Sequence, residues 1–316
     1  MALTIASKMK FLFLLAALLG CTEGALSQQD MENGDPDTTR LLSFETVIPP
    51  SFKGIQPNVI QDPARSLSPF FEKLFLLQNP VDTEKTVVRI VHIGDSHVRS
   101  HEFTPALHLR LAGVFGNAAP GTVEGYRSIG ILEENDSSGV ICHCIGINGA
   151  TSENFMDDNY LTEIQHLQPD LIIISLGTNE SVGKYDPESH YDTMATLFSM
   201  VKTYCPAVPI LYTTPPGSFK PVYRRYRKRN RVYRRVVRTE ANKNMDNVAS
   251  TIVRFAADHQ AASWDLFSIV GGEKYACQNW LSGNYFQRDK VHFISAGYAL
   301  QGNLLFEAIM NEYNKK

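Results

Sequence analysis

The sequence is poor in the features that mark membrane-spanning, metal-bound and fibrous proteins. Beyond its amino terminus, no segment has the run of about 18 apolar residues from which a transmembrane helix is built. There are five cysteines but no Cys-x-x-Cys pair, which argues against a zinc ribbon, and there is no His-Glu-x-x-His motif. The 21 glycines follow no collagen period, and 20% charged residues are too few for a long coiled coil.

What the chain does contain is enough apolar material for a large core. Its 316 residues are 43% hydrophobic and 10% aromatic, which argues against intrinsic disorder. The 30 basic and 33 acidic residues give a net charge of −3, which disfavours a nucleic-acid-binding protein that is basic along its whole length. The composition therefore indicates a globular protein with one large domain or two small ones.

Residues 1–20 resemble an export signal. Two lysines, Lys8 and Lys10, precede an apolar run that is too short to span a bilayer. The run ends in Leu-Leu-Gly-Cys, similar to a bacterial lipobox, so Cys21 is expected to carry a lipid, with ordinary cleavage after residues 25–27 as the alternative. Removal of the signal takes the net charge from −3 to −5. We expect export from a bacterial cell, to the periplasm or outer membrane as a lipoprotein or to the medium, with the lipid as the only membrane contact.

The remaining chain divides into two parts. Residues 21–84 are predicted to form a tether and an amino-terminal arm with a short helix near 69–77. Residues 85–316 are predicted to form one domain of the size of a small enzyme. Strands are predicted over 87–93, 140–147, 170–176, 209–213 and 262–269, and helices over about 102–115, 152–168, 188–204, 228–260 and 295–314. Continuous apolar strands that alternate with helices indicate a three-layer α/β/α sandwich around a five-stranded parallel sheet.

Polar motifs follow the first three predicted strands, at the edge of a parallel sheet where ligands bind. The first motif, Gly94-Asp95-Ser96-His97, exposes a serine where a strand meets a helix, although a helix N-cap has the same pattern. After the second strand, Gly149 has a backbone N–H that can approach a ligand closely. After the third, Asn179 can direct its side-chain amide at an anion, although an ordinary turn also accommodates both residues.

A fourth motif, Asp289-Lys290-Val291-His292, precedes the last predicted helix. A carboxylate three residues before a histidine can orient the imidazole and stabilise its protonated form. An exposed serine, donors for an oxyanion and an Asp–His pair are together the groups required for acyl transfer through a covalent serine ester. In these motifs and their order, residues 86–314 resemble the SGNH hydrolases, also called GDSL-like esterases.

The resemblance implies a role for each motif residue. Ser96 is the expected nucleophile, His292 the base that takes its proton, and Asp289 the residue that orients His292. The backbone N–H groups of Ser96 and Gly149 and the side chain of Asn179 are expected to form the oxyanion hole. The family also implies a flavodoxin-like five-stranded sheet and a reaction that needs neither a metal nor an organic cofactor.

The residue sequence of the motifs is similar to that of a bacterial exported subgroup that includes peptidoglycan O-acetylesterases. His97 stands where leucine is commonest in the family. Some members of the subgroup carry a carbohydrate-binding module between the first two motifs, and the roughly 50 residues between Ser96 and Gly149 leave no room for one, which weakens the case for a cell-wall substrate. We expect a monomeric esterase that removes small acyl groups, acetyl above all, from a carbohydrate. The alternatives are a carbohydrate O-acyltransferase and a non-catalytic glycan-binding protein, and the intact motifs argue against the latter.

The most uneven stretch of charge is residues 222–238, where nine of seventeen residues are basic. Interpreted as a helix, this arginine-rich segment has Arg224, Arg231 and Arg235 on one face and Tyr226 and Tyr233 on a buried face. Such a face is either a solvated surface or a docking surface for an anionic polymer such as a uronate-rich polysaccharide. Burial of the tyrosines and export both disfavour nucleic acid.

Three further residues are candidates for substrate binding: His97, Trp280 and Tyr285, of which His97 alternatively supports the site through a hydrogen bond. No metal site is expected, because His97 and His101 have helical spacing without the glutamate of a metalloprotease motif. The cysteines other than Cys21 are expected to be buried thiols, with a disulfide between Cys205 and Cys277 as the alternative.

Overall fold

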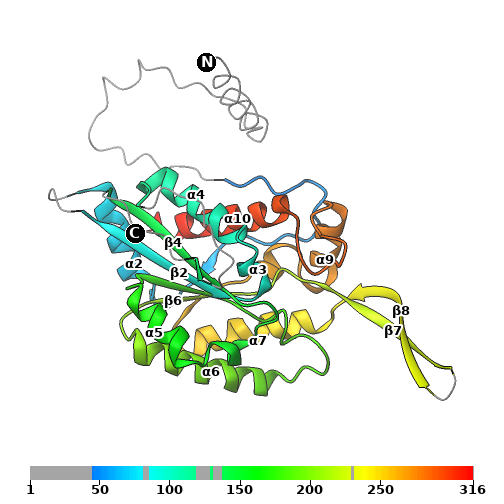
Figure 1. Cartoon of the computed structure of the whole chain (residues 1–316). Helices are drawn as coiled ribbons and strands as arrows, with labels where there is room; N and C mark the ends of the chain where they lie inside the picture. Colours follow the sequence, from blue (N-terminus) through cyan, green and yellow to red (C-terminus); the bar gives the residue numbers. More distant parts are fainter. Residues whose placement is uncertain (1–44, 81–84, 119–128, 131–136, 229–230, 316) are drawn as a thin grey trace, which may run out of the picture. The chain divides into compact units, whose positions relative to one another are not determined.

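Five parallel strands form the centre of a seven-stranded sheet in the computed structural model (Figure 1). They are β2 (Val87–Gly94), β4 (Gly139–Gly146), β5 (Leu171–Ser175), β6 (Ile210–Thr213) and β9 (Ala262–Trp264), in the spatial order β4-β2-β5-β6-β9. Relative to chain order this is the 2-1-3-4-5 arrangement of flavodoxin-like folds. Two short antiparallel strands, β1 (Ile60–Gln61) and β3 (Ile129–Gly130), extend the two edges. The predicted fold class is confirmed.

The structure describes residues 45–80, 85–118, 129–130, 137–228 and 231–315, all within one compact unit. The predicted export signal, Cys21 and the first 24 residues of the predicted tether and arm, 21–44, lie outside these residues. Among the helices that are described, none has the length and apolar character that crossing a membrane requires.

Helices cover both faces of the sheet (Figure 1). One face packs against α2 (Ser68–Gln78), α4 (Phe103–Phe115) and α10 (Ser295–Tyr313), and the other against α5 (Asp158–His166), α6 (Pro187–Tyr204) and α7 (Asn244–Asp258). The side chains of β2 alternate between the two cores: Val88 and Ile90 lie in one, and Val91 and Ile93 in the other. Burial on both sides explains why these strands are apolar without interruption.

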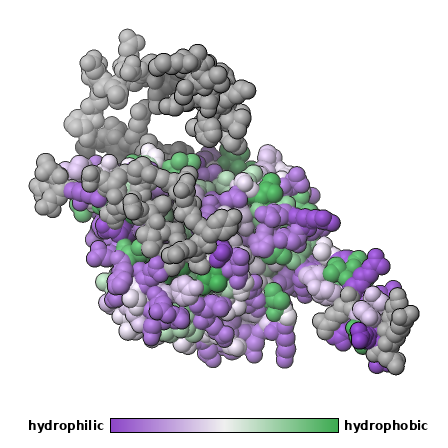
Figure 2. Space-filling model, viewed as in Figure 1, coloured by the Kyte–Doolittle hydropathy of each residue, from purple (hydrophilic) through white to green (hydrophobic). Residues whose placement is uncertain are grey.

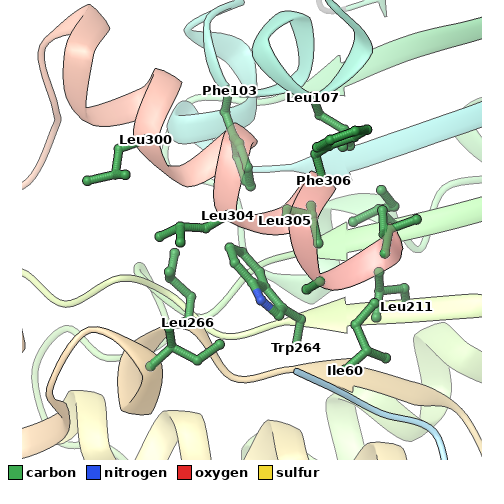
Figure 3. Close-up of a cluster of buried hydrophobic side chains, with 14 of the residues drawn as sticks. Ile60, Phe103, Leu107, Leu211, Trp264, Leu266, Leu300, Leu304, Leu305 and Phe306 are labelled. Atoms are coloured by element: carbon green, nitrogen blue, oxygen red, sulfur yellow. The ribbon is translucent and has the colours of Figure 1, made fainter. Parts of the chain in front are cut away.

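The described part of the amino-terminal arm packs against this sheet. Strand β1 pairs with β9, and the side-chain oxygen of Asn58 accepts a hydrogen bond from the Trp264 indole at 2.9 Å. Trp264 lies between β9 and α10 in the larger core, beside Ile60, Leu266 and Leu304 (Figure 3). Residues from the arm therefore complete the packing of the last parallel strand.

The strand register aligns the ends that carry the predicted motifs. Strand β2 pairs with β4 on one side and with β5 on the other, so that Gly94 lies beside both Gly146 and Ser175. The loops after these three strands consequently leave the sheet at one edge. The chain reverses its direction of winding there, between β2 and β5, which is where open parallel sheets form ligand sites.

Two predicted elements are wrong in part. The fifth strand ends at Trp264, because Asp265 caps a short helix, α8 (Leu266–Ile269). The arginine-rich segment is not helical: it forms an antiparallel hairpin of β7 (Phe219–Lys228) and β8 (Arg231–Ala241), and helix α7 begins only at Asn244. Tyrosine and valine, which favour strands, recur along this segment, and that preference prevails over the helical spacing of its arginines.

The helix predicted over 152–168 is in fact two elements, a 3-10 turn, η2 (Ser152–Phe155), and the helix α5. The expected thiols are confirmed: Cys142, Cys144, Cys205 and Cys277 are buried and unbridged. The alternative disulfide is wrong because Cys205 and Cys277 belong to the cores on opposite faces of the sheet.

Candidate active site

The loop after β2 places Ser96 at the first residue of a short helix, α3 (Ser96–Arg99). The carboxylate of Asp95 caps this helix by accepting a hydrogen bond from the backbone N–H of His97 at 2.9 Å. Gly146 allows α3 to approach the end of β4, because a Cβ there would lie 2.3 Å from the Arg99 backbone nitrogen. Ser96 remains partly exposed as a result, while the residues on either side of it are buried.

The loop between α9 (Gly272–Ser282) and α10 brings Asp289 and His292 to the same place. One carboxylate oxygen of Asp289 accepts from the backbone N–H groups of Val291 and His292, at 2.9 and 3.0 Å. Lys290, which follows Asp289 directly, has φ +59°, in the left-handed region that non-glycine residues rarely occupy. The Asp289 carboxylate therefore fixes the turn as well as facing the imidazole.

These two loops form a continuous chain of hydrogen bonds. The Nε2 atom of His292 lies 2.9 Å from the hydroxyl oxygen of Ser96, and its Nδ1 atom lies 2.7 Å from the second carboxylate oxygen of Asp289. Although partial burial opposes ionisation, hydrogen bonds from the ring and backbone of His292 lower the pKa of Asp289. The geometry allows His292 to take a proton from Ser96 while an ionised Asp289 stabilises the imidazolium.

Gly149 and Asn179 lie on the loops after β4 and β5, at the same edge. Gly149 is exposed with φ +74°, and a Cβ there would meet nothing within 4 Å, so it is the backbone conformation that favours glycine. The amide nitrogen of Asn179 donates to the carbonyl of Ala150 at 2.9 Å and to Asp95 at 3.3 Å. The shorter bond orients the amide, and the second, at 3.3 Å, is the weaker of the two.

Glu180 was not identified as a site residue by sequence reasoning, although it follows Asn179 directly. Its two carboxylate oxygens accept from the backbone N–H groups of Ser152 and Gly177, both at 2.9 Å. It thereby joins the loop that carries Gly149 to the loop that carries Asn179. A side chain that acts on backbone donors leaves no recognisable residue pattern, so only its adjacency to Asn179 was available as a signal.

His97 lies next to His292, on the buried side of the site. Its ring centroid is 5.4 Å from that of His292, and its Nδ1 atom is 3.1 Å from the Tyr298 hydroxyl. Burial, and then the proximity of His292, lower the pKa of His97 to about 3, so that it stays neutral. This buried position fits the supporting role considered for His97 and not a wall of an open pocket.

Trp280 does not line the site, contrary to prediction, and the half-buried Tyr285 packs against it. The Trp280 side chain is 0% exposed, and its indole donates to the carbonyl of Pro216 at 2.9 Å. It packs edge-on against Tyr285 and against Phe293, the residue after His292. The aromatic character of both residues is used in the core, where they support the loop that carries His292.

A cavity of about 210 Å³ lies beside the loops that carry Gly149 and Asn179. Its lining includes Thr151, Glu180 and Lys184, together with Glu153 and Asp186, so its charge is acidic on balance. Residues of the Ser–His–Asp chain do not contribute to its lining. Within the described part of the chain, no cluster of three or more side chains has the composition to hold a metal ion.

We predict that Asn179→Ala lowers kcat for ester hydrolysis by about 10²- to 10³-fold, the usual effect of removing one oxyanion donor. KM should change little, because the bond strengthens only as the oxyanion forms. Steady-state kinetics on p-nitrophenyl acetate checks this, with Asn247→Ala, an exposed asparagine on α7, as the control. A decrease in kcat of less than threefold would contradict the role of Asn179.

Comparison with known proteins agrees with this geometry. The model of the GDSL-like lipase/acylhydrolase family matches residues 117–300, a span that includes Gly149, Asn179, Asp289 and His292 but not Ser96. A search of curated protein sequences found no match.

Solved structures resemble the chain in fold. A peptidoglycan O-acetylesterase has a TM-score of 0.66 at 18% identity, covering 81% of this chain and 99% of its own. The acetylxylan esterase from Geobacillus stearothermophilus has a TM-score of 0.44 at 17% identity, covering 70% and 94%. A lipase/acylhydrolase from Enterococcus faecalis has 0.45 at 18% identity, covering 71% and 96%. At 18% identity, the similarity to the peptidoglycan O-acetylesterase is one of fold.

Proposed function

Because the chain belongs to the GDSL-like lipase/acylhydrolase family, we propose that this ester-bond hydrolase removes small acyl groups, acetyl above all, from a carbohydrate. The observation that carries the proposal is the unbroken chain of hydrogen bonds from Ser96 through His292 to Asp289. The same residue types in the same geometry perform acyl transfer on several unrelated folds.

In the proposed first half-reaction, the Ser96 oxygen bonds to the acyl carbon while its proton passes to Nε2 of His292. The electron pair of the carbonyl moves onto its oxygen, which then receives hydrogen bonds from Ser96, Gly149 and Asn179. Collapse of this intermediate breaks the bond to the sugar oxygen, which takes the proton from His292. The sugar hydroxyl leaves, and the acyl group remains on Ser96.

In the second half-reaction, water attacks the acyl carbon as His292 takes one of its protons. Collapse then breaks the bond to Ser96, whose oxygen recovers that proton, and the carboxylic acid leaves. An acyltransferase would differ only here, with a second hydroxyl in place of water. The side chain of His292 is 34% exposed in the described structure, which gives water access and favours hydrolysis.

Two observations support a carbohydrate as the leaving group. The residues of the motifs are similar to those of the exported subgroup described above, and the fold is shared with a peptidoglycan O-acetylesterase. The lipobox-like Leu-Leu-Gly-Cys21 supports export, so the proposal includes a location outside the cytoplasm. Labelling with palmitate, with Cys21→Ser as the control, tests the lipid anchor.

We predict acetate release from at least one acetylated polysaccharide in a panel that includes peptidoglycan and xylan. On p-nitrophenyl acetate, accumulation of the covalent acyl-enzyme should appear as an initial burst of p-nitrophenol when deacylation is slower than acylation. Acetate should be measured by an enzyme-coupled assay, with Ser96→Ala as the blank. Hydrolysis of p-nitrophenyl acetate without acetate release from any polysaccharide would contradict the carbohydrate substrate, although the esterase activity itself would stand.

A further inference from the structure

The hairpin of β7 and β8 is the most strongly charged feature of the molecule outside the site. It extends away from the α/β sandwich (Figure 1) and presents both hydrophilic and hydrophobic residues to solvent (Figure 2). Its arginines with described side chains are all exposed: Arg224, Arg225, Arg227, Arg231, Arg235 and Arg238. Of these, Arg238 has an acidic partner, Glu240, at the base of the hairpin. The outer part is therefore a concentration of uncompensated positive charge.

The strand register sorts these residues onto two faces. Arg224 is directly opposite Arg235, and Tyr226 is directly opposite Tyr233, so these two pairs share one face with Arg231. The two tyrosine rings stack at 5.6 Å with an interplanar angle of 20°, while remaining 47% and 41% exposed. One face thus presents a stacked, half-exposed pair of tyrosines with arginine on both sides along the ribbon.

This arrangement is unfavourable for the free hairpin. Like charges directly opposite each other destabilise a pair of strands, and exposed aromatic side chains cost hydration free energy. A bound polyanion would remove the first cost, because carboxylates accept the forked hydrogen bonds of arginine. A sugar ring with an apolar face would reduce the cost of exposing the tyrosines by packing on them. An acidic polysaccharide supplies both groups in one repeating chain.

The base of the hairpin is joined to the candidate active site on two sides. The backbone N–H of Phe219 donates to the carbonyl of Lys290, between Asp289 and His292, at 2.9 Å. At the other strand end, Asn242 and Asn244 donate to the carbonyl of Ser181, two residues after Asn179, at 3.3 and 2.8 Å. A polymer that lies along the hairpin is therefore led to the loops around Ser96.

From these contacts we infer that the hairpin is a docking arm that binds an acidic, O-acylated polysaccharide and delivers its ester groups to Ser96. The inference rests on the proposed function, because the bound polymer is the substrate. The acidic balance of the cavity beside Glu180 disfavours an anionic chain there and leaves the hairpin side for it. A nucleic acid would match the charge but carries no acyl ester for a hydrolase of this family.

Binding should first be measured without turnover. The full chain carrying Ser96→Ala is titrated with de-esterified polygalacturonate, and the titration is repeated with Arg224→Gln and Arg235→Gln added. We expect the dissociation constant to rise about tenfold and its salt dependence to decrease. Tyr226→Ala should weaken binding at every salt concentration. A control that removes two exposed lysines elsewhere, Lys53→Gln with Lys274→Gln, should bind like the parent.

Turnover should then be measured in chains with Ser96 intact. The kcat/KM of the double arginine variant for acetylated polygalacturonate should decrease about tenfold relative to its kcat/KM for p-nitrophenyl acetate. Equal binding by the double variant and the parent would overturn the inference, as would tighter binding to single-stranded DNA or to anionic phospholipid vesicles. A failure of acetate release with binding intact would instead contradict the proposed function.

Discussion

Replacement of Ser96 by alanine is expected to lower kcat for ester hydrolysis by at least about 10⁴-fold, because no other hydroxyl lies within reach of His292 among the described hydrogen bonds. The oxyanion donors and substrate contacts would remain, so that KM should change by less than about threefold. The alanine should not unfold the protein, because the Ser96 side chain is partly exposed and the substitution removes a single oxygen.

Two measurements check this expectation. Steady-state kinetics on p-nitrophenyl acetate gives kcat, with Ser282→Ala on α9 as the matched control that should retain full activity. Mass spectrometry after treatment with a fluorophosphonate should show one added phosphonyl group on the parent and none on the alanine variant. Activity of the Ser96 variant within tenfold of the parent would eliminate the serine-ester mechanism.

Replacement of Asp289 by asparagine is expected to lower kcat by about 10²- to 10⁴-fold. The asparagine oxygen can still accept from the backbone of Val291 and His292, so the turn should be retained. The side-chain amide would however face Nδ1 of His292 and favour the wrong tautomer, while the charge that stabilises the imidazolium is lost. We expect the lower part of this range because the Asp289 side chain is 48% exposed and water replaces part of its effect.

The pH profile separates this effect from a general loss of structure. Because the pKa of Asp289 is lowered, its carboxylate is ionised above about pH 5, and the ratio of parent to variant activity should be constant from there upward. Below that range the ratio should decrease as the parent loses the same charge. Asp192→Asn, on α6, is the control for removal of an exposed carboxylate. A variant within threefold of the parent at neutral pH would mean that His292 is oriented by other groups.

Much of this molecule was predictable because the relevant patterns are local. Strands such as Val87–Gly94 are apolar without interruption, since both of their faces are buried, and the motifs after the first three strands are specific in combination with Asp289 and His292. The alignment of these ends follows from the parallel sheet itself. The five strands were therefore predictable from the sequence pattern, whereas the pairing of Ser96 with Asp289 and His292, which follow no strand, came from the resemblance to SGNH hydrolases.

The misjudged features depend on contacts that the sequence does not display. Trp280 precedes the Asp–His motif closely enough to suggest a pocket wall, but its exposure is decided by Phe52, Tyr285 and Phe293, which surround it in space. The arginine-rich segment has spacings that fit a helix and a strand equally, and its antiparallel register settles which residues face each other. The interpretation of its tyrosines as buried was wrong for the same reason.

The distance along the chain between Ser96 and His292 has a consequence for biosynthesis. The two residues in hydrogen-bond contact are 196 positions apart, and the base lies in about the last tenth of the sequence. Contacts of such long range form late, since a large loop must be closed before they stabilise anything. A growing chain therefore has Ser96 without His292 until its last residues are made, and we expect hydrolytic activity only after α10 packs against α4.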